Sequence, residues 1–193
     1  MKICFATNNS HKLREIQQIL GDEFEITSLK EIGCLDEIPE PYETLEENSA
    51  TKAQYIYERY QIPVFADDSG LEVKALNGAP GVHTAYYGGA ERSADKNMDR
   101  VLGEMQGVED REAQFRAVMT YIDSTGTYAF EGVVKGQITL EKTGDGGFGY
   151  DPVFQPEGYS QSFAQLPDEV KNEISHRGRS LEKLVDFLKS RNK

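Results

Sequence analysis

Apolar residues recur at helical spacing in four segments of the chain, which predicts four amphipathic helices. Over 44–60, Thr44 and Glu47 also have the spacing of an N-terminal capping box, and Ser93 stands where a later helix would begin. The predicted apolar faces are Leu13, Ile16, Ile19 and Leu20; Ala50, Ala53, Ile56, Tyr57 and Tyr60; Met98, Val101, Leu102 and Met105; and Leu181, Leu184, Val185 and Leu188.

Short apolar or alternating segments predict the strands. A strand at 63–66 ends on Asp67 and Asp68, and residues 71–76 continue as strand or extended chain. The other predicted strands are 2–7, 24–29, 113–123 and 127–136, the last two forming a hairpin around Ser124–Gly126. Strands and helices mix without strict alternation, which favours an α/β fold with a mixed sheet and a single domain over 1–193.

Composition narrows the possible functions. The chain has 193 residues, of which 38% are hydrophobic, and no segment approaches the length of a membrane span. The N-terminus lacks a basic-then-apolar signal region, so we expect a cytoplasmic protein that does not bind membranes. A net charge of −12 disfavours a nucleic-acid polymer as partner but leaves a small anionic ligand possible. Cys4 and Cys34 form neither a disulfide framework nor a zinc set, and Cys4 is typical of a small core residue.

FADDSGLEV (65–73) places two adjacent carboxylates, Asp67 and Asp68, after an apolar strand. Asp, Ser and Gly are turn formers, so a turn is one interpretation. The other is a metal or acid/base site, because paired carboxylates are costly to bring together unless a positive group lies opposite. This segment alone favours neither.

Three further segments carry candidate cations and acids. TNNSHK (7–12), between a predicted strand and helix, is either a phosphate-binding loop with Lys12 or a polar turn. Glu40 lies in a stiff segment between two prolines, and Lys52 lies on the next helix; each is either a functional group or a solvated side chain. Lys171, His176 and Arg177, placed just ahead of the last helix, suit phosphate oxygens and base carbonyls, with a solvated helix start as the alternative.

The loop GDGGFGYDPVF (144–154) holds four glycines within six residues, which costs backbone entropy. Phe148 and Tyr150 within it could stack on a flat heteroaromatic ligand, or could turn into the core. The sequence lacks HExxH and GxSxG, and its cysteines lie in no nucleophile motif. The reaction classes that stay open are metal-assisted hydrolysis and acid/base hydrolysis. The candidate metal ligands carry oxygen, which suits magnesium or manganese.

Taken in order, these segments resemble the inosine triphosphate pyrophosphatase family, enzymes that hydrolyse non-canonical purine nucleoside triphosphates. The resemblance runs nearly end to end through FATNNSHKLREI, TLEENSATKA, FADDSGLEVKALNGAPGV, GGFGYDPVF and FAQLPDEVKNEISHRGRSL. It implies an elongated, two-lobed α/β molecule around a twisted mixed sheet flanked by helices. It also implies an active site in the cleft between the lobes, and a homodimer.

The resemblance further implies roles for individual residues. Asp68 would accept the proton of the attacking water, supported by Asp67, and Glu40 and Asp68 would hold Mg²⁺ or Mn²⁺. ITP, dITP or XTP would be the substrate and would be cleaved at the α-phosphorus. Its binding residues would be Thr7, Asn8, Asn9, Ser10, His11, Lys12, Lys52, Ser69, Phe148, Gly149, Tyr150, Asp151, Lys171, His176 and Arg177.

Two positions depart from the family pattern: Asn8 stands where glycine is common, and Tyr86 stands where many bacterial relatives carry arginine. Three other functions stay open. A related pyrophosphatase preferring pyrimidine or modified bases would use the same phosphate-binding residues, and a nucleotide-binding module would bind without hydrolysis. A carboxylate-pair glycosidase is disfavoured, because adjacent residues of a strand point to opposite faces and would not flank one bond.

Overall fold

The computed structural model describes residues 2–21 and 24–191, so positions 1, 22–23 and 192–193 of the predicted domain lie outside the described residues. Within these residues, six strands form one sheet in the order β2–β1–β3–β4–β5–β6. β1 is parallel to β2 and β3, whereas β5 and β6 are antiparallel, so the predicted α/β fold with a mixed sheet is confirmed. The strands are β1 (Lys2–Phe5), β2 (Glu25–Ser28), β3 (Val64–Val73), β4 (Glu112–Asp123), β5 (Gly126–Ile138) and β6 (Phe154–Pro156).

The helices begin where polar side chains cap them. Thr44 accepts the N–H of Glu47 at 3.2 Å and Ser93 accepts that of Lys96 at 3.3 Å, so the two predicted starts are confirmed. None of the helices in the described ranges is both long and apolar enough to cross a membrane. The helices are α1 (Ser10–Leu20), α2 (Leu45–Tyr60), α3 (Ala94–Glu104), α4 (Asp168–Ile174) and α5 (His176–Arg191), with 3₁₀ turns η1 (Lys74–Leu76), η2 (Gly81–Tyr86), η3 (Asp151–Val153) and η4 (Phe163–Gln165).

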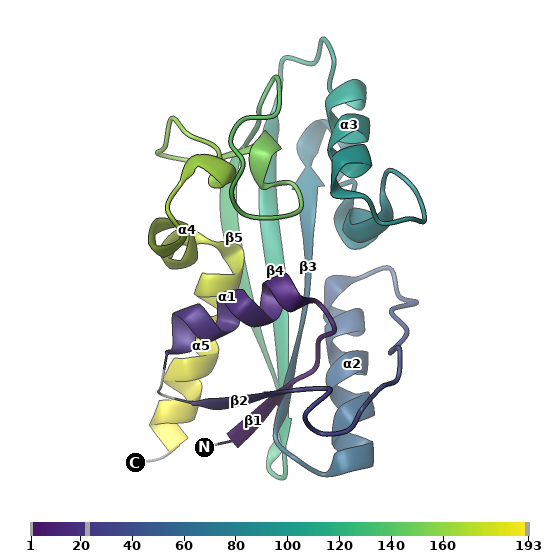
Figure 1. The fold of residues 1–193 in the computed structure, drawn as a ribbon, viewed down its shortest axis with the longest axis vertical. Helices are drawn as coiled ribbons and strands as arrows, with labels where there is room; N and C mark the ends of the chain where they lie inside the picture. The colour runs from purple at the N-terminus through teal and green to yellow at the C-terminus, as the bar shows by residue number, and fades with distance from the viewer. Residues whose placement is uncertain (1, 22–23, 192–193) are drawn as a thin grey trace. The chain divides into compact units, whose positions relative to one another are not determined.

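The chain forms two compact units, and the first comprises 1–68, 117–132 and 177–193. Neighbouring residues of a strand point to opposite faces of the sheet. In this unit both faces carry apolar side chains, and helices cover each face. Phe5 and Phe65 pack with α1 and α5 on one face, whereas Cys4 and Val64 pack with α2 on the other (Figure 1). Cys4 is a buried core residue, as predicted.

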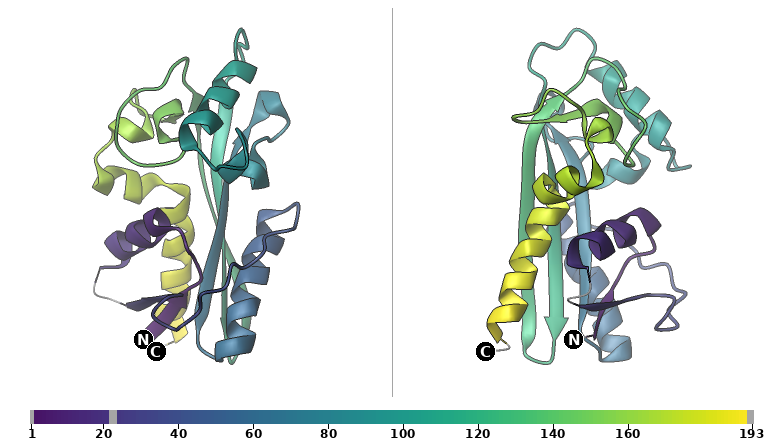
Figure 2. Two further views of the ribbon diagram at one scale, coloured as in Figure 1. Left: turned by 45° about the vertical axis from the view of Figure 1, so that its right-hand side comes forward. Right: turned by 60° about the vertical axis from the view of Figure 1, so that its left-hand side comes forward.

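The second unit comprises 69–116 and 133–176 and has its own core. Leu71 and Val73 of β3 pack in that core with Met98 and Val101 of α3, which lies beside the strands of this unit (Figure 2). Aromatic residues from the glycine-rich loop and from the segment after it also belong to this core; they are Tyr150, Phe154 and Phe163. The predicted elongated shape, two lobes and intervening cleft stay predictions.

One element differs from its prediction in a way that affects the site. β3 does not end on the acidic pair; it runs from Val64 to Val73, with Asp67 and Asp68 in its middle and η1 following. The turn-forming composition of Asp-Asp-Ser-Gly is overridden because cations from distant segments neutralise both carboxylates. At the C-terminal end, Lys171 lies in the short helix α4, and His176 and Arg177 form the start of α5 rather than preceding it.

Candidate active site in the acidic strand

Asp67 and Asp68 point to opposite faces of β3. Asp67 lies on the side of α1 and α5, with its Oδ1 2.6 Å from Lys12 Nζ and its Oδ2 3.0 Å from Arg177 Nε. Asp68 lies on the side of α2, with its Oδ1 3.7 Å from Lys52 Nζ. The alternation of strand side chains therefore gives two neighbouring acids different cationic partners.

On the first side, Asp67 belongs to a buried network of four charges. Arg177 also donates to the carboxylate of Glu15, and the Asp67 side chain has no exposed surface. Burial raises the pKa of Asp67, but Arg177, Lys12 and Lys52 outweigh that effect and hold the pKa well below its usual range. For Lys12 burial dominates over the attraction of Asp67 and lowers the pKa. Asp67 is thus an ionised carboxylate held by fixed partners.

On the α2 side of β3, three oxygen-bearing groups surround the ammonium of Lys52. It donates to the Glu40 carboxylate and to the backbone carbonyl of Asp67 at 2.7 Å, and it faces the Asp68 carboxylate. Burial raises the pKa of Asp68, and Lys52 and Lys12 offset only part of that rise. Burial lowers the pKa of Lys52, but Asp68, Glu40 and Asp67 more than reverse it. Glu40 and Asp68 therefore converge on one cation.

This pair of carboxylates suits a magnesium ion, which keeps some of its waters, better than a metal ion whose ligands all come from the protein. The Glu40 side chain is 40% exposed and that of Asp68 is 12% exposed, so the position is open to water and ligand. Within 2–21 and 24–191, no three His, Cys, Asp or Glu side chains gather in an arrangement that could hold a metal ion. Mg²⁺ is usually bound by one or two carboxylates together with waters and substrate phosphates, so the donor set fits.

The predicted phosphate-binding loop ends in the first turn of α1. Asn9 caps the helix, because its Oδ1 accepts the N–H groups of His11 at 3.0 Å and Lys12 at 3.2 Å. The N–H of Asn9 in turn donates to Thr7 Oγ1 at 3.1 Å. Asn8, Ser10 and His11 are exposed, so this helix start and its positive dipole end are accessible to an anion.

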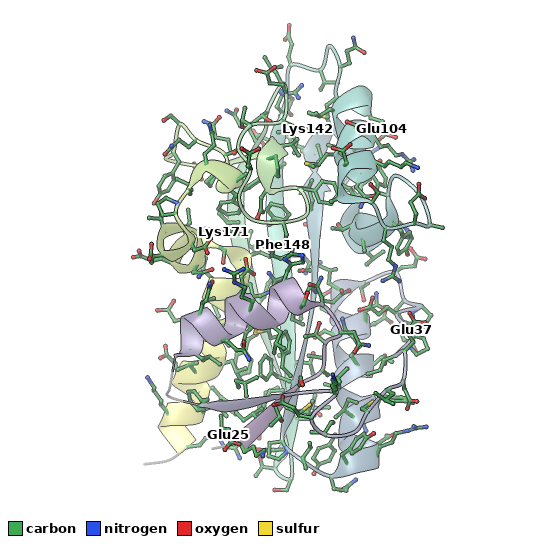
Figure 3. All side chains as sticks on the ribbon, in the orientation of Figure 1. Glu25, Glu37, Glu104, Lys142, Phe148 and Lys171 are labelled. Carbon is green, nitrogen blue, oxygen red and sulfur yellow. The ribbon has the colours of Figure 1, made fainter. Side chains whose placement is uncertain are left out.

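In the second unit, the structure brings together three of the predicted nucleoside-binding residues. Lys171 Nζ lies 2.6 Å from Asp151 Oδ2 and 4.8 Å from the centre of the Phe148 ring; Figure 3 labels Lys171 and Phe148 on neighbouring segments. Asp151 Oδ2 also accepts the N–H of Phe148 at 2.9 Å. Gly147 makes this possible: at φ +67°, a Cβ added there would lie 2.1 Å from Asp151 Oδ2. Gly149 also has a positive φ of 62°.

Other predicted residues of this unit are more deeply placed. Tyr150 is 2% exposed, and its hydroxyl donates to the Thr84 carbonyl at 2.7 Å, so its ring is part of the core. The predicted contact between Tyr150 and substrate stays a prediction. His176 is buried with its ring stacked on Phe115 at 4.8 Å, and Ser69 is half-buried in β3.

Sequence comparison identifies the family. The model of the Ham1 family matches residues 3–187, nearly the whole chain. The chain belongs to the Ham1 family. The resemblance found in the sequence motifs is thereby confirmed, and the two departures can be placed within a Ham1 fold. Tyr86 is exposed on η2 with its hydroxyl 2.9 Å from His83 Nδ1, and Asn8 is exposed beside the cap of α1.

Close Ham1 relatives carry a specific name. A Porphyromonas gingivalis protein called dITP/XTP pyrophosphatase is 50% identical over 188 residues, covering 97% of each chain. A Flavobacterium johnsoniae protein of the same name is 46% identical and covers 97% of this chain and 98% of its own. The Staphylococcus aureus Ham1 protein has a matching structure, with a TM-score of 0.91, 35% identity and coverage of 99% of this chain and 100% of its own.

Sequence reasoning did not select Glu15, which the structure places in the buried network of this Ham1 protein. Its signal was faint but present: Glu15 follows Lys12 by three positions and directly precedes Ile16 on a helix whose apolar face is buried. An acid beside a buried helical stripe needs a cationic partner, and that partner, Arg177, is 162 residues away.

Proposed function

We propose that this protein hydrolyses non-canonical purine nucleoside triphosphates such as dITP, XTP and ITP to the nucleoside monophosphate and pyrophosphate. The observation that carries the proposal is the convergence of Glu40 and Asp68 on one cation in a chain of the Ham1 family. Such a pair is suited to binding a divalent ion together with a polyphosphate.

The chain's own groups would divide the reaction between them. Asp68 would accept the proton of the water that attacks the α-phosphorus, a role favoured by the raised pKa of its carboxyl. Lys12 and the N-terminus of α1 would stabilise the charge that develops on the leaving pyrophosphate. Mg²⁺ bound by Glu40 and Asp68, with Mn²⁺ as a substitute, would neutralise phosphate charge and acidify water.

Base selection would use the second unit. Phe148 offers a half-buried aromatic surface for stacking, beside the buried pair of Lys171 and Asp151. A hydrogen-bond donor facing the 6-oxo group would reject adenine, because mispairing a buried polar group costs about 1–3 kcal/mol. A backbone N–H would be that donor; the alternative is the side chain of Arg177, which belongs to the first unit. Arg177 would then have to release a carboxylate, since it donates to both Glu15 and Asp67.

Three further properties belong to the same proposal. The enzyme would act as a homodimer in the cytoplasm, and its partner would be the small nucleotide rather than a nucleic-acid polymer. The net charge of −12 supports the last point, because a net negative charge repels the phosphate backbone of DNA or RNA.

The test is pyrophosphate release from a nucleotide panel, with and without Mg²⁺. We expect dITP, XTP and ITP to be cleaved, ATP and the pyrimidine triphosphates to be poor substrates, and EDTA to abolish turnover. Preference for a pyrimidine or modified base would identify a related pyrophosphatase of other selectivity. Tight binding of ITP without pyrophosphate release would identify a non-catalytic nucleotide-binding module.

A further inference from the structure

The buried network of the first unit is a chain of four charges that alternate in sign. Lys12 and Glu15 lie on α1, Asp67 lies on β3, and Arg177 lies in the first turn of α5. The contacts run from Lys12 to Asp67 at 2.6 Å, from Asp67 to Arg177 at 3.0 Å, and from Arg177 to Glu15. The charges of these four residues, two positive and two negative, sum to zero.

Stability alone is a weak explanation for this arrangement. Taking charges out of water is costly, and a buried ion pair often stabilises a protein no better than apolar residues of the same volume. Asp67 and Arg177 are almost entirely buried, and Glu15 is nearly so. What the network does provide is geometry: each carboxylate fixes the orientation of the cation next to it.

The outermost cation is the one that reaches solvent. The Lys12 side chain is 14% exposed, and Lys12 lies in the first turn of α1, where the helix dipole favours anions. Glu15, which contacts Arg177 and lies three contacts away from Lys12, is 7% exposed. Glu15 can therefore influence a bound anion through the network and not by touching it.

We propose that Glu15 is a positioning residue for polyphosphate binding, acting through Arg177 and Asp67 to fix the ammonium of Lys12. The inference rests on the proposed function, in which Lys12 binds the triphosphate. When the charge of Glu15 is removed, Arg177 is drawn more fully to Asp67, and the Asp67 carboxylate holds Lys12 less firmly. The lysine then loses part of its orientation before the anion arrives, which weakens binding.

The test is a double-mutant cycle with inorganic tripolyphosphate as the probe, titrated calorimetrically at a fixed Mg²⁺ concentration. Glu15→Gln should weaken tripolyphosphate binding about tenfold, because the long Lys12 side chain must then be ordered when the anion binds. In a Lys12→Met background, Glu15→Gln should change the affinity less than about twofold, because the group it acts through is gone. With dITP, Glu15→Gln should raise KM more than it lowers kcat.

The matched control is Glu72→Gln in the second unit. Glu72 also pairs with an arginine, Arg116, at 3.0 Å, but that pair is only partly buried and belongs to neither carboxylate site described above. Its removal should leave tripolyphosphate affinity within about twofold of the wild type. Circular dichroism would verify folding; should Glu15→Gln fail to fold, Glu15→Asp, one methylene shorter, enters the same cycle with a smaller expected loss.

The outcomes separate the inference from the function beneath it. Unchanged or tighter tripolyphosphate binding by folded Glu15→Gln, while Lys12→Met binds weakly, overturns the positioning role and leaves the proposed function standing. Equal losses from Glu15→Gln with and without Lys12 also overturn it, because they indicate a general structural effect. Normal binding by Lys12→Met instead overturns the assignment of Lys12 to the triphosphate.

Discussion

The buried position of Asp67 gives a direct prediction about stability. Asp67→Asn keeps the shape of the side chain but removes its charge from between Lys12, at 2.6 Å, and Arg177, at 3.0 Å. Among the four residues Lys12, Glu15, Asp67 and Arg177, the change leaves two positive charges facing the single carboxylate of Glu15. Breaking a buried pair from one side costs about 3–5 kcal/mol. At about 2–4 °C per kcal/mol for a chain of this size, Tm should fall by about 6–20 °C.

The pH dependence of that loss follows from the lowered pKa of Asp67. A carboxyl group with a lowered folded pKa adds stability that is fully present above its unfolded pKa, about 3.9, and is lost as the pH falls through the folded value. The difference in unfolding free energy between wild type and Asp67→Asn should therefore stay constant from pH 7 to about pH 5. It should shrink only in more acidic solution.

Urea denaturation followed by circular dichroism measures both effects without reference to activity. The control is Asp36→Asn, since Asp36 pairs with Arg59 at 2.6 Å but its side chain is 45% exposed. That change should have a far smaller effect on unfolding, because exposed ion pairs contribute little. A loss below about 1 kcal/mol for Asp67→Asn, or a difference that fades between pH 7 and pH 5, would refute the reasoning.

Three further substitutions address separate parts of the molecule. Asp68→Asn should lower turnover by about 10²–10⁴-fold with folding intact, and normal turnover would exclude Asp68 as the base. Gly147→Ala places a Cβ 2.1 Å from Asp151 Oδ2 at a φ of +67°, so it should lower Tm as well as raise KM for dITP; an unchanged KM in the folded variant would separate that loop from substrate binding. Tyr150→Phe removes one bond to the Thr84 carbonyl and should cost about 1 kcal/mol in urea with kcat preserved, whereas lost activity would indicate a direct catalytic role.

Much of the fold could be predicted from the sequence because periodicity and capping are local signals. Thr44 and Ser93 mark the helix starts, and the alternation of 113–123 and 127–136 marks the strands of the hairpin. These patterns depend on residues within a few positions of one another, so a single sequence contains them.

The acidic strand could not be predicted in the same way. Asp-Asp-Ser-Gly has the composition of a turn, and the cations that permit it to lie inside a strand come from Lys12, Lys52 and Arg177. Their proximity is a property of the folded chain. For the same reason the sequence left open whether Tyr150 faced a ligand or the core, and the burial of its ring decides for the core.

The alternation within β3 has a consequence for how this segment can vary. Because each side chain faces the opposite way from the next, deleting one residue between Val64 and Asp67 would turn the remaining acids over. Asp67 would then face α2 instead of Lys12 and Arg177, and Asp68 would face α1 and α5 instead of Lys52. Substitutions can be absorbed along this stretch, but a change in its length would exchange the surroundings of both acids at once. We therefore expect natural variants of the chain to keep the number of residues from 64 to 68 fixed.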